Sequence, residues 1–120
     1  MYIILGKNGY IAEAIVKELK SRGLPHVAWS RTDVDYTHQV ELEYALLTET
    51  EAQDIHIINC AGYIGKPNVD ACELAKADCI EGNVLFPAML SSLCARNEYN
   101  LTHISSGCIY GGYEKHFTEE

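Results

Sequence analysis

Reactive side chains gather near the end of this 120-residue chain, directly after an apolar run. The stretch LTHISSGCIY at residues 101–110 contains Ser105, Ser106 and Cys108. A serine hydroxyl can donate a hydrogen bond to an oxygen that gains negative charge during a reaction. A thiol can exchange protons once its surroundings bring its pKa near neutral pH. The alternatives are a serine-rich turn and a cysteine that packs as a small hydrophobe.

A glycine-rich turn near the start of the chain is a second candidate for chemistry. Gly6, Gly9 and Ala12 form a GxxGxxA pattern between an apolar run and a segment of helical period. Gly6 permits a tight turn, Gly9 lets the backbone approach a phosphate, and Ala12 lets helix and strand pack closely. The N–H groups of the helix start would then bind an anion, although small residues also serve bare helix packing. The cofactor-binding residues predicted here are Gly6, Lys7, Asn8, Gly9, Tyr10 and Ile11.

A third candidate lies after the second apolar run, where the sequence reads SRTD at residues 30–33. In dinucleotide-binding folds an acidic residue near this place favours the ribose hydroxyls of NAD, whereas a basic residue accommodates the 2′-phosphate of NADP. Ser30 and Arg31 therefore favour NADP, with NAD as the alternative cofactor and a solvated loop arginine as the alternative for Arg31. Asp33 is expected either to accept a hydrogen bond from the adenine amino group or to cap the turn.

These candidates need a scaffold, and the apolar pattern predicts one. Short apolar runs indicate strands over residues 2–5, 26–30, 55–59 and 101–105. Helical spacing indicates a first helix from Gly9 to a stop at Gly23. A second helix is predicted over residues 38–50, with Val40, Tyr44 and Leu47 on one face. A helical region after Gly62 is predicted to break near residues 81–83. Strands alternating with helices predict an α/β fold with a doubly wound, Rossmann-like parallel sheet.

Composition limits the partners. The formal net charge of −8 argues against nucleic acid or an anionic membrane surface as the main partner. The five cysteines form no CxxC pair, and their odd number favours reduced thiols, so we expect a cytoplasmic location. No metal site is expected. Neither a signal peptide nor a membrane span is predicted from the apolar runs.

A longer segment carries a family resemblance. Asn59 ends the strand predicted over residues 55–59, and Cys60, Ala61 and Gly62 follow it, where small residues let the backbone pass beside a cofactor ribose. Together with the glycine turn, this pattern resembles the extended, nucleotide-sugar branch of the short-chain dehydrogenase/reductase superfamily. The segment CAGYIGKPNVDACE at residues 60–73 is similar to the UDP-4-keto-6-deoxyglucose 3,5-epimerase/4-reductases of UDP-rhamnose synthesis and their relatives, the dTDP-4-dehydrorhamnose reductases. Asn83 stands where that branch keeps an asparagine, and the resemblance implies that Asn83, like Asn59, Cys60, Ala61 and Gly62, belongs to the cofactor-binding residues.

The resemblance implies roles for particular residues. It nominates Ser106 over Ser105 as the hydroxyl that polarises a sugar carbonyl, and Cys108 as the acid/base of epimerisation. It implies NADPH as the cofactor and a nucleotide-sugar as the substrate. The substrate contacts that it suggests are Tyr63, Lys66 and Asn68.

The resemblance covers only the N-terminal, cofactor-binding part of such an enzyme. The YxxxK pair of the superfamily does not occur in these 120 residues. We therefore expect residues 1–120 to form a truncated NAD(P)-binding domain that lacks the substrate domain and is inactive alone. Its expected protein partner is a second copy or the missing C-terminal half.

Two other functions remain open at this point. One is a non-catalytic dinucleotide-binding sensor or regulatory module, which would need the glycine turn but neither Ser106 nor Cys108. The other is an epimerase/reductase similar to GDP-fucose synthase, which shares the Ser-x-Cys-Ile-Tyr arrangement. Retention of the serine and the cysteine favours an enzyme over a sensor.

Overall fold

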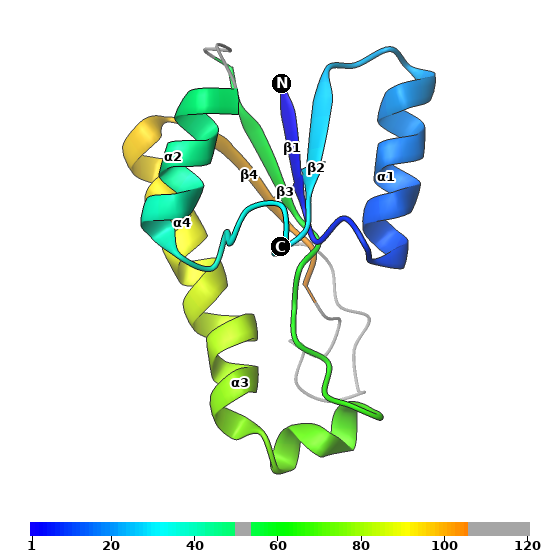
Figure 1. Cartoon of the computed structure of the whole chain (residues 1–120), viewed down its shortest axis with the longest axis vertical. Helices are drawn as coiled ribbons and strands as arrows, with labels where there is room; N and C mark the ends of the chain where they lie inside the picture. Colours follow the sequence, from blue (N-terminus) through cyan, green and yellow to red (C-terminus); the bar gives the residue numbers. More distant parts are fainter. Residues whose placement is uncertain (50–53, 106–120) are drawn as a thin grey trace, which may run out of the picture.

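The computed structural model describes residues 1–49 and 54–105 of the chain. Four parallel strands form one sheet in the order β2-β1-β3-β4 (Figure 1). Their bounds are Tyr2–Leu5 for β1, His26–Trp29 for β2, His56–Asn59 for β3 and Asn100–His103 for β4. The four strands predicted from the apolar runs are thus confirmed to within one or two residues at each end.

The helices lie between the strands, as a parallel sheet requires. They are α1 (Tyr10–Ser21), α2 (Gln39–Glu49), α3 (Lys76–Ile80) and α4 (Phe86–Asn97), together with a 3-10 helix η1 (Val69–Glu73) and a π-helical segment η2 (Glu81–Leu85). The break predicted near residues 81–83 is this π-helical segment. No helix in the described ranges is long and apolar enough to cross a membrane.

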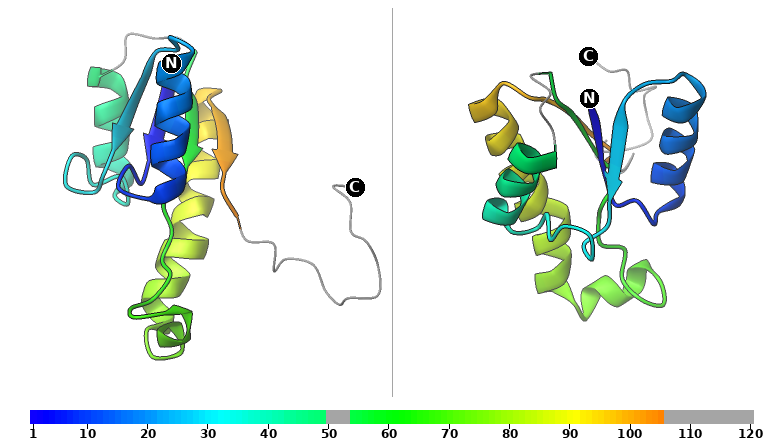
Figure 2. Two further views of the ribbon diagram at one scale, coloured as in Figure 1. Left: turned by 90° about the vertical axis from the view of Figure 1, so that its right-hand side faces the viewer. Right: turned by 45° about the horizontal axis from the view of Figure 1, so that its top comes forward.

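Helices cover both faces of the sheet. Helix α1 packs on one face, while α2 and α4 pack on the other, and the tilted view in Figure 2 shows the same arrangement. Strand β1 serves both layers, because successive side chains of a strand point to opposite faces. Ile3 and Leu5 belong to the apolar cluster beneath α2 and α4, and Ile4 belongs to the cluster beneath α1. The prediction of a doubly wound α/β sheet is confirmed.

Helix α2 is present as predicted, but the apolar face predicted for it, formed by Val40, Tyr44 and Leu47, is exposed to solvent. Val40, Tyr44 and Leu47 are 77%, 69% and 75% exposed. Leu42 and Leu46 are buried instead. The helix carries apolar residues on two of its faces, and helical spacing alone cannot decide which face meets the sheet.

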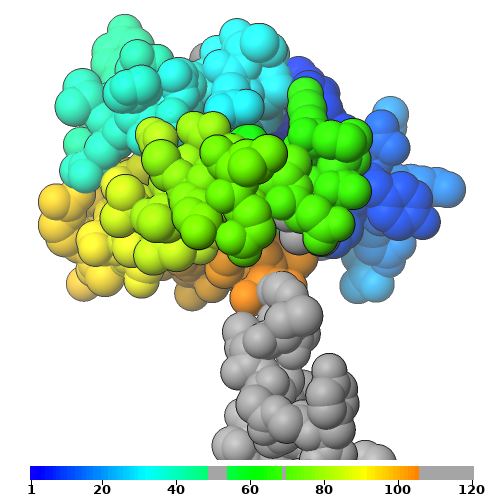
Figure 3. Space-filling view, turned by 90° about the horizontal axis from the view of Figure 1, so that it is seen from below, coloured from blue at the N-terminus to red at the C-terminus, as the bar shows by residue number. Residues whose placement is uncertain are grey.

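The strand order also defines where a ligand would meet the sheet. Strands β1 and β3 are neighbours at the centre of the sheet. Strand β2 lies outside β1 and strand β4 lies outside β3, so the direction of the strand order reverses between β1 and β3. In doubly wound sheets the crevice for ligands lies at such a reversal, outside the carboxyl ends of the strands. Figure 3 looks onto that end, where the segments that follow β1, β2 and β3 lie side by side.

Candidate functional site

The turn between β1 and α1 is pressed against the segment after β3. Gly6 has a φ of +85°, and a Cβ added there would lie 2.9 Å from the backbone nitrogen of Ala61. Both facts require glycine, since side chains rarely adopt this φ and backbone atoms cannot move aside. The Gly9 N–H donates to the Gly6 carbonyl oxygen at 2.9 Å, which closes the turn. The tight turn predicted at Gly6 is therefore present.

Helix α1 begins directly after this turn. Gly9 is its N-cap residue, with an extended backbone and no side-chain cap hydrogen bond. Tyr10 and Ile11, in the first turn of the helix, are 88% and 47% exposed. The first N–H groups of a helix lack intrahelical partners. This end of α1 thus offers donors and a positive dipole end to an anion.

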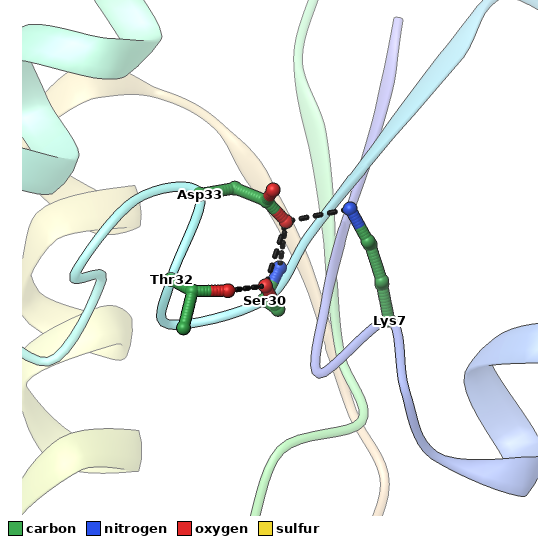
Figure 4. Close-up of polar contacts among 4 residues, drawn as sticks. All are labelled: Lys7, Ser30, Thr32 and Asp33. Atoms are coloured by element: carbon green, nitrogen blue, oxygen red, sulfur yellow. Dashed lines mark hydrogen bonds and ion pairs between the residues drawn. The ribbon is translucent and has the colours of Figure 1, made fainter.

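The loop after β2 is organised around the carboxylate of Asp33 (Figure 4). Its Oδ2 atom accepts hydrogen bonds from Lys7 Nζ at 2.7 Å, Ser30 Oγ at 2.7 Å and the Ser30 backbone N–H at 2.8 Å. The hydrogen bond from Lys7, followed by those from Ser30, holds the pKa of Asp33 well below its usual range. Of the two roles predicted for Asp33, the contacts of a turn cap are the ones present.

Ser30 and Arg31, the pair predicted to favour NADP, differ in their surroundings. Ser30 is 7% exposed, and its hydroxyl is already hydrogen-bonded to Asp33 and to Thr32 Oγ1, the latter at 2.8 Å. Arg31 is exposed and makes no hydrogen bond or ion pair with any residue that the structure describes. The guanidinium of Arg31 is therefore the group of this pair that is available to a ligand.

A hollow of about 440 Å³ opens beside Asp33, between its loop and α2. Val34 and Ala45 give it apolar walls. The other lining residues are Val40, Glu41, Tyr44 and Thr48. No lining residue is basic, so the hollow suits an uncharged ring better than a phosphate.

Asn59 organises the segment after β3 from a buried position. Its side chain is 0% exposed, and its Oδ1 accepts a hydrogen bond from the Ala61 N–H at 3.0 Å. Its Nδ2 lies 3.1 Å from Nδ1 of His103, at the end of β4. The Cys60 N–H donates to the Leu5 carbonyl oxygen at 3.0 Å. The Asn59 side chain thus shapes the backbone of the loop at Ala61.

The π-helical segment η2 holds the same loop further along. Asn83 Oδ1 accepts from the Tyr63 N–H at 2.9 Å, and Asn83 Nδ2 donates to the Tyr63 carbonyl oxygen at 2.8 Å. A Cβ added to Gly82 would lie 2.8 Å from Cβ of Tyr63, so only glycine permits this approach. Asn83, predicted as a cofactor residue, therefore positions the loop through both of its amide atoms.

The suggested substrate residues lie on this loop, between β3 and η1. Tyr63 is half-buried, whereas Lys66 and Asn68 are exposed. Nearby, a hydrogen bond with Cys72 raises the pKa of Cys79 to about 11. Cys79 is therefore a protonated thiol near neutral pH.

The two predicted catalytic residues, Ser106 and Cys108, lie outside the described residues. The segment leading to them is held at the ligand end of the sheet, because the Ile104 N–H donates to the Asn59 carbonyl oxygen at 3.0 Å. Ser105, which follows, is exposed. Within residues 1–49 and 54–105, no group of three or more His, Cys, Asp or Glu side chains could hold a metal ion.

Sequence reasoning missed three residues that build this site. Thr32 is hydrogen-bonded to the Ser30 hydroxyl through its Oγ1 atom. The turn-forming residues of the SRTD segment could have indicated this contact. Tyr36, 4% exposed, stacks on Phe86 with ring centroids 5.5 Å apart, which anchors the end of the β2 loop in the core. His103 contacts Asn59 from a strand 44 positions away in sequence, so no local pattern points to the pairing.

The fold and this glycine turn define the doubly wound α/β class, in which ligands meet the carboxyl ends of the strands. Within that class, the chain belongs to the family described as the RmlD substrate binding domain, whose model matches residues 1–120. It is 28% identical over 111 residues to the trifunctional UDP-glucose 4,6-dehydratase/UDP-4-keto-6-deoxy-D-glucose 3,5-epimerase/UDP-4-keto-L-rhamnose-reductase RHM3 of Arabidopsis thaliana. The predicted resemblance to the rhamnose enzymes is thus confirmed.

Solved structures give the same fold. The UDP-rhamnose synthase of Acanthamoeba polyphaga mimivirus matches with a TM-score of 0.78 at 21% identity, over 92% of this chain. The dTDP-4-dehydrorhamnose reductase of Bacillus anthracis, solved in complex with NADP, matches with a TM-score of 0.69 at 20% identity, over 83% of this chain. The UDP-glucose 4-epimerase of Thermus thermophilus, solved with NAD, matches with a TM-score of 0.68 at 20% identity, over 81% of this chain.

The chain spans only part of each of these proteins. It covers 16% of the Arabidopsis enzyme, 38% of the viral synthase, and 34% of both the bacterial reductase and the 4-epimerase.

Proposed function

We propose that this chain is the cofactor-binding part of an NADPH-dependent nucleotide-sugar 3,5-epimerase/4-reductase. The observation that carries the proposal is the contact of Gly6 with the backbone of Ala61. This contact joins the start of α1 to the β3 loop, and the parallel pairing of β1 with β2 places the β2 loop at the same end of the sheet. The family match and the names of the relatives support the choice of this enzyme class.

The residues present fit a dinucleotide. A Cβ on Gly9 would lie 3.3 Å from the Gly6 carbonyl oxygen, so glycine at this position avoids crowding within the tight turn. The first N–H groups of α1 would receive the pyrophosphate, and Arg31 would meet the 2′-phosphate of NADP. The cofactor, when bound, supplies the hydride for reduction.

The substrate proposed is a nucleoside-diphosphate 4-keto-6-deoxyhexose, the class of sugar that the names of the rhamnose relatives describe. Ser106 would donate a hydrogen bond to the C4 carbonyl oxygen, where negative charge develops during reduction. Cys108 would move protons at C3 and C5, the carbons that flank the carbonyl. Tyr63, Lys66 and Asn68 would contact the sugar nucleotide.

The cofactor assignment is tested by the dissociation constants of NADPH and NADH for the full-length protein. Arg31→Asp should raise the ratio of the NADPH constant to the NADH constant by about tenfold or more, because it replaces a cation near the 2′-phosphate with an anion. Arg22→Asp, at the far end of α1, is the matched control and should leave the ratio unchanged. An unchanged ratio in Arg31→Asp would remove the 2′-phosphate assignment.

The catalytic assignment is tested with the keto-sugar in deuterated water. Cys108→Ala should abolish deuterium incorporation at C3 and C5, while Ser106→Ala should lower kcat of the reduction by about a hundredfold. Full incorporation in Cys108→Ala would show that another group performs the epimerisation.

A further inference from the structure

An ion pair between Lys7 and Asp33 lies at the carboxyl end of the sheet. Lys7 comes from the turn after β1 and Asp33 from the loop after β2, and Figure 4 shows their side chains meeting between these elements. The three hydrogen bonds to the Asp33 carboxylate, one from Lys7 and two from Ser30, all end on Oδ2. In the described part of the chain Oδ1 accepts none, and the side chain is 39% exposed. One carboxylate oxygen is thus left for a ligand.

Lys7 is equally open to a second partner. Asp33 is the only acceptor that its ammonium has among residues 1–49 and 54–105, and its side chain is 41% exposed. An ammonium carries three N–H donors. Exposed ion pairs are weak, whereas hydrogen bonds to a phosphate dianion are strong. A phosphate that arrived beside Lys7 would therefore compete successfully with Asp33.

The charges around Asp33 are unevenly distributed. Lys7 pairs with Asp33, and Arg31 adds a positive charge that has no ion-pair partner among the described residues. The nearby carboxylate of Asp35 faces His38 instead. The hollow between Asp33 and α2, by contrast, is lined by Glu41 and by no basic residue. In Figure 4, Lys7 approaches Asp33 from the side opposite α2. A phosphate would meet Asp33 on the Lys7 side, where its charge is already balanced.

We propose that Lys7 and Asp33 form an exchangeable pair that lets one site accept both NADPH and NADH. With NADPH, Lys7 Nζ leaves Asp33 and binds the 2′-phosphate together with Arg31. With NADH, Lys7 stays on Oδ2 of Asp33, and Oδ1 accepts the hydrogen of the ribose 2′-hydroxyl. The inference rests on the proposed cofactor function and adds the residues that determine its specificity.

The test compares the dissociation constants of NADPH and NADH, and those of adenosine 2′,5′-bisphosphate and AMP, for the full-length protein by calorimetry. Lys7→Gln should raise the dissociation constants of NADPH and the bisphosphate about tenfold and change those of NADH and AMP less than about threefold. Asp33→Asn should raise the dissociation constant of NADH without raising that of NADPH. Lys7→Arg, which keeps the cation, should restore NADPH binding. Lys20→Gln, an exposed lysine in the last turn of α1, controls for the loss of one charge.

The possible results separate the two proposals. A wild-type protein that binds neither nucleotide overturns the proposed function and this inference with it. A wild-type protein that binds both, with the same NADPH to NADH ratio in Lys7→Gln and Asp33→Asn, overturns only the exchangeable pair. If Lys7→Gln unfolds, Asp33→Asn decides alone, because a loss confined to NADH supports the pair and an equal loss of both nucleotides contradicts it.

Discussion

Gly6 and Gly23 both have a positive φ, of +85° and +65°, but only one of them is crowded. A Cβ on Gly6 would meet the backbone of Ala61, whereas a Cβ on Gly23 would meet nothing within 4 Å. The two glycines therefore separate the cost of an unfavourable backbone conformation from the cost of a steric clash. At Gly6 the clash lies between two segments of the proposed cofactor site.

Replacing each glycine by alanine should measure the two costs. We expect Gly23→Ala to lower the free energy of unfolding by about 1 kcal/mol, for the left-handed backbone alone. Gly6→Ala should lower it by about 2–4 kcal/mol, since the backbone cost is joined by displacement of the β3 loop. Urea unfolding monitored by the single tryptophan, Trp29, would give both values. Equal losses would mean that the loop after β3 yields easily.

Asp33 should make the stability of the protein sensitive to acid. Hydrogen bonds from Lys7 and Ser30 hold its pKa in the folded state well below the usual range of an aspartate. A carboxyl with a lowered folded pKa stabilises the fold above its unfolded pKa, and this contribution is lost as the pH falls below that value. Asp33→Asn should therefore lose less stability than the wild type between about pH 5 and pH 2.

The matched control for the acid experiment is Asp54→Asn. The side chain of Asp54 is exposed and makes no hydrogen bond or ion pair in the part of the chain that the structure describes. Urea midpoints measured across the same pH range should fall in parallel for Asp54→Asn and the wild type. A parallel fall in Asp33→Asn as well would show that the Lys7 and Ser30 contacts are not formed in solution.

Among the elements, η2 links the helical layer to the ligand end of the sheet. Its π-helical turn places Asn83 so that both atoms of the side-chain amide bond the backbone of Tyr63, while Gly82 lets Tyr63 approach closely. π-Helical turns inside helices occur frequently at functional sites. Here the turn fixes the β3 loop that carries the proposed substrate contacts.

Removing the Asn83 amide should loosen that loop. Asn83→Ala is expected to lower the free energy of unfolding by about 1–3 kcal/mol, since two hydrogen bonds to the backbone are lost. The Tyr63 amide should also exchange its hydrogen faster. Asn8→Ala, an exposed asparagine without a partner among the described residues, should change stability by less than about 0.5 kcal/mol. Unchanged exchange at Tyr63 in Asn83→Ala would contradict this account of η2.

At the scale of the whole molecule, the two faces of the sheet carry apolar clusters of unequal size. The cluster beneath α2 and α4 contains thirteen buried residues, among them Leu42, Leu90 and Leu93. The cluster beneath α1 contains four: Ile4, Ala12, Leu19 and Ile58. Because burial of apolar surface is the main stabilising contribution, α1 is the less firmly held layer.

Hydrogen exchange of the native protein should reveal this asymmetry. We expect amides in the middle of α1 to exchange through an opening that costs at least about 1.4 kcal/mol less than the opening of β1 and β3. The amides of α4, on the larger cluster, serve as the internal comparison and should exchange with those of the strands. Equal opening free energies for α1 and α4 would show that the two layers unfold as one unit.

The amino-acid sequence by itself determined the strands, the helices, the doubly wound class and the glycine turn. These features follow from local patterns, since apolar period, turn residues and glycine spacing act over a few neighbouring positions. The family resemblance was also carried by a contiguous segment, residues 60–73. For this reason the sequence was sufficient for the order of the elements and for the position of the glycine turn.

Only the tertiary structure decided which side chains meet. Packing decided which apolar face of α2 meets solvent. It also paired Lys7 with Asp33 and brought Asn59 into contact with His103, although these residues are distant in the sequence. Such contacts depend on strand order and on which helix face covers the sheet, and neither leaves a signal in local spacing. The residues of the candidate site could therefore be predicted from the sequence. Their ion pair and hydrogen bonds could not, because these form only when the sheet brings the ends of its strands together.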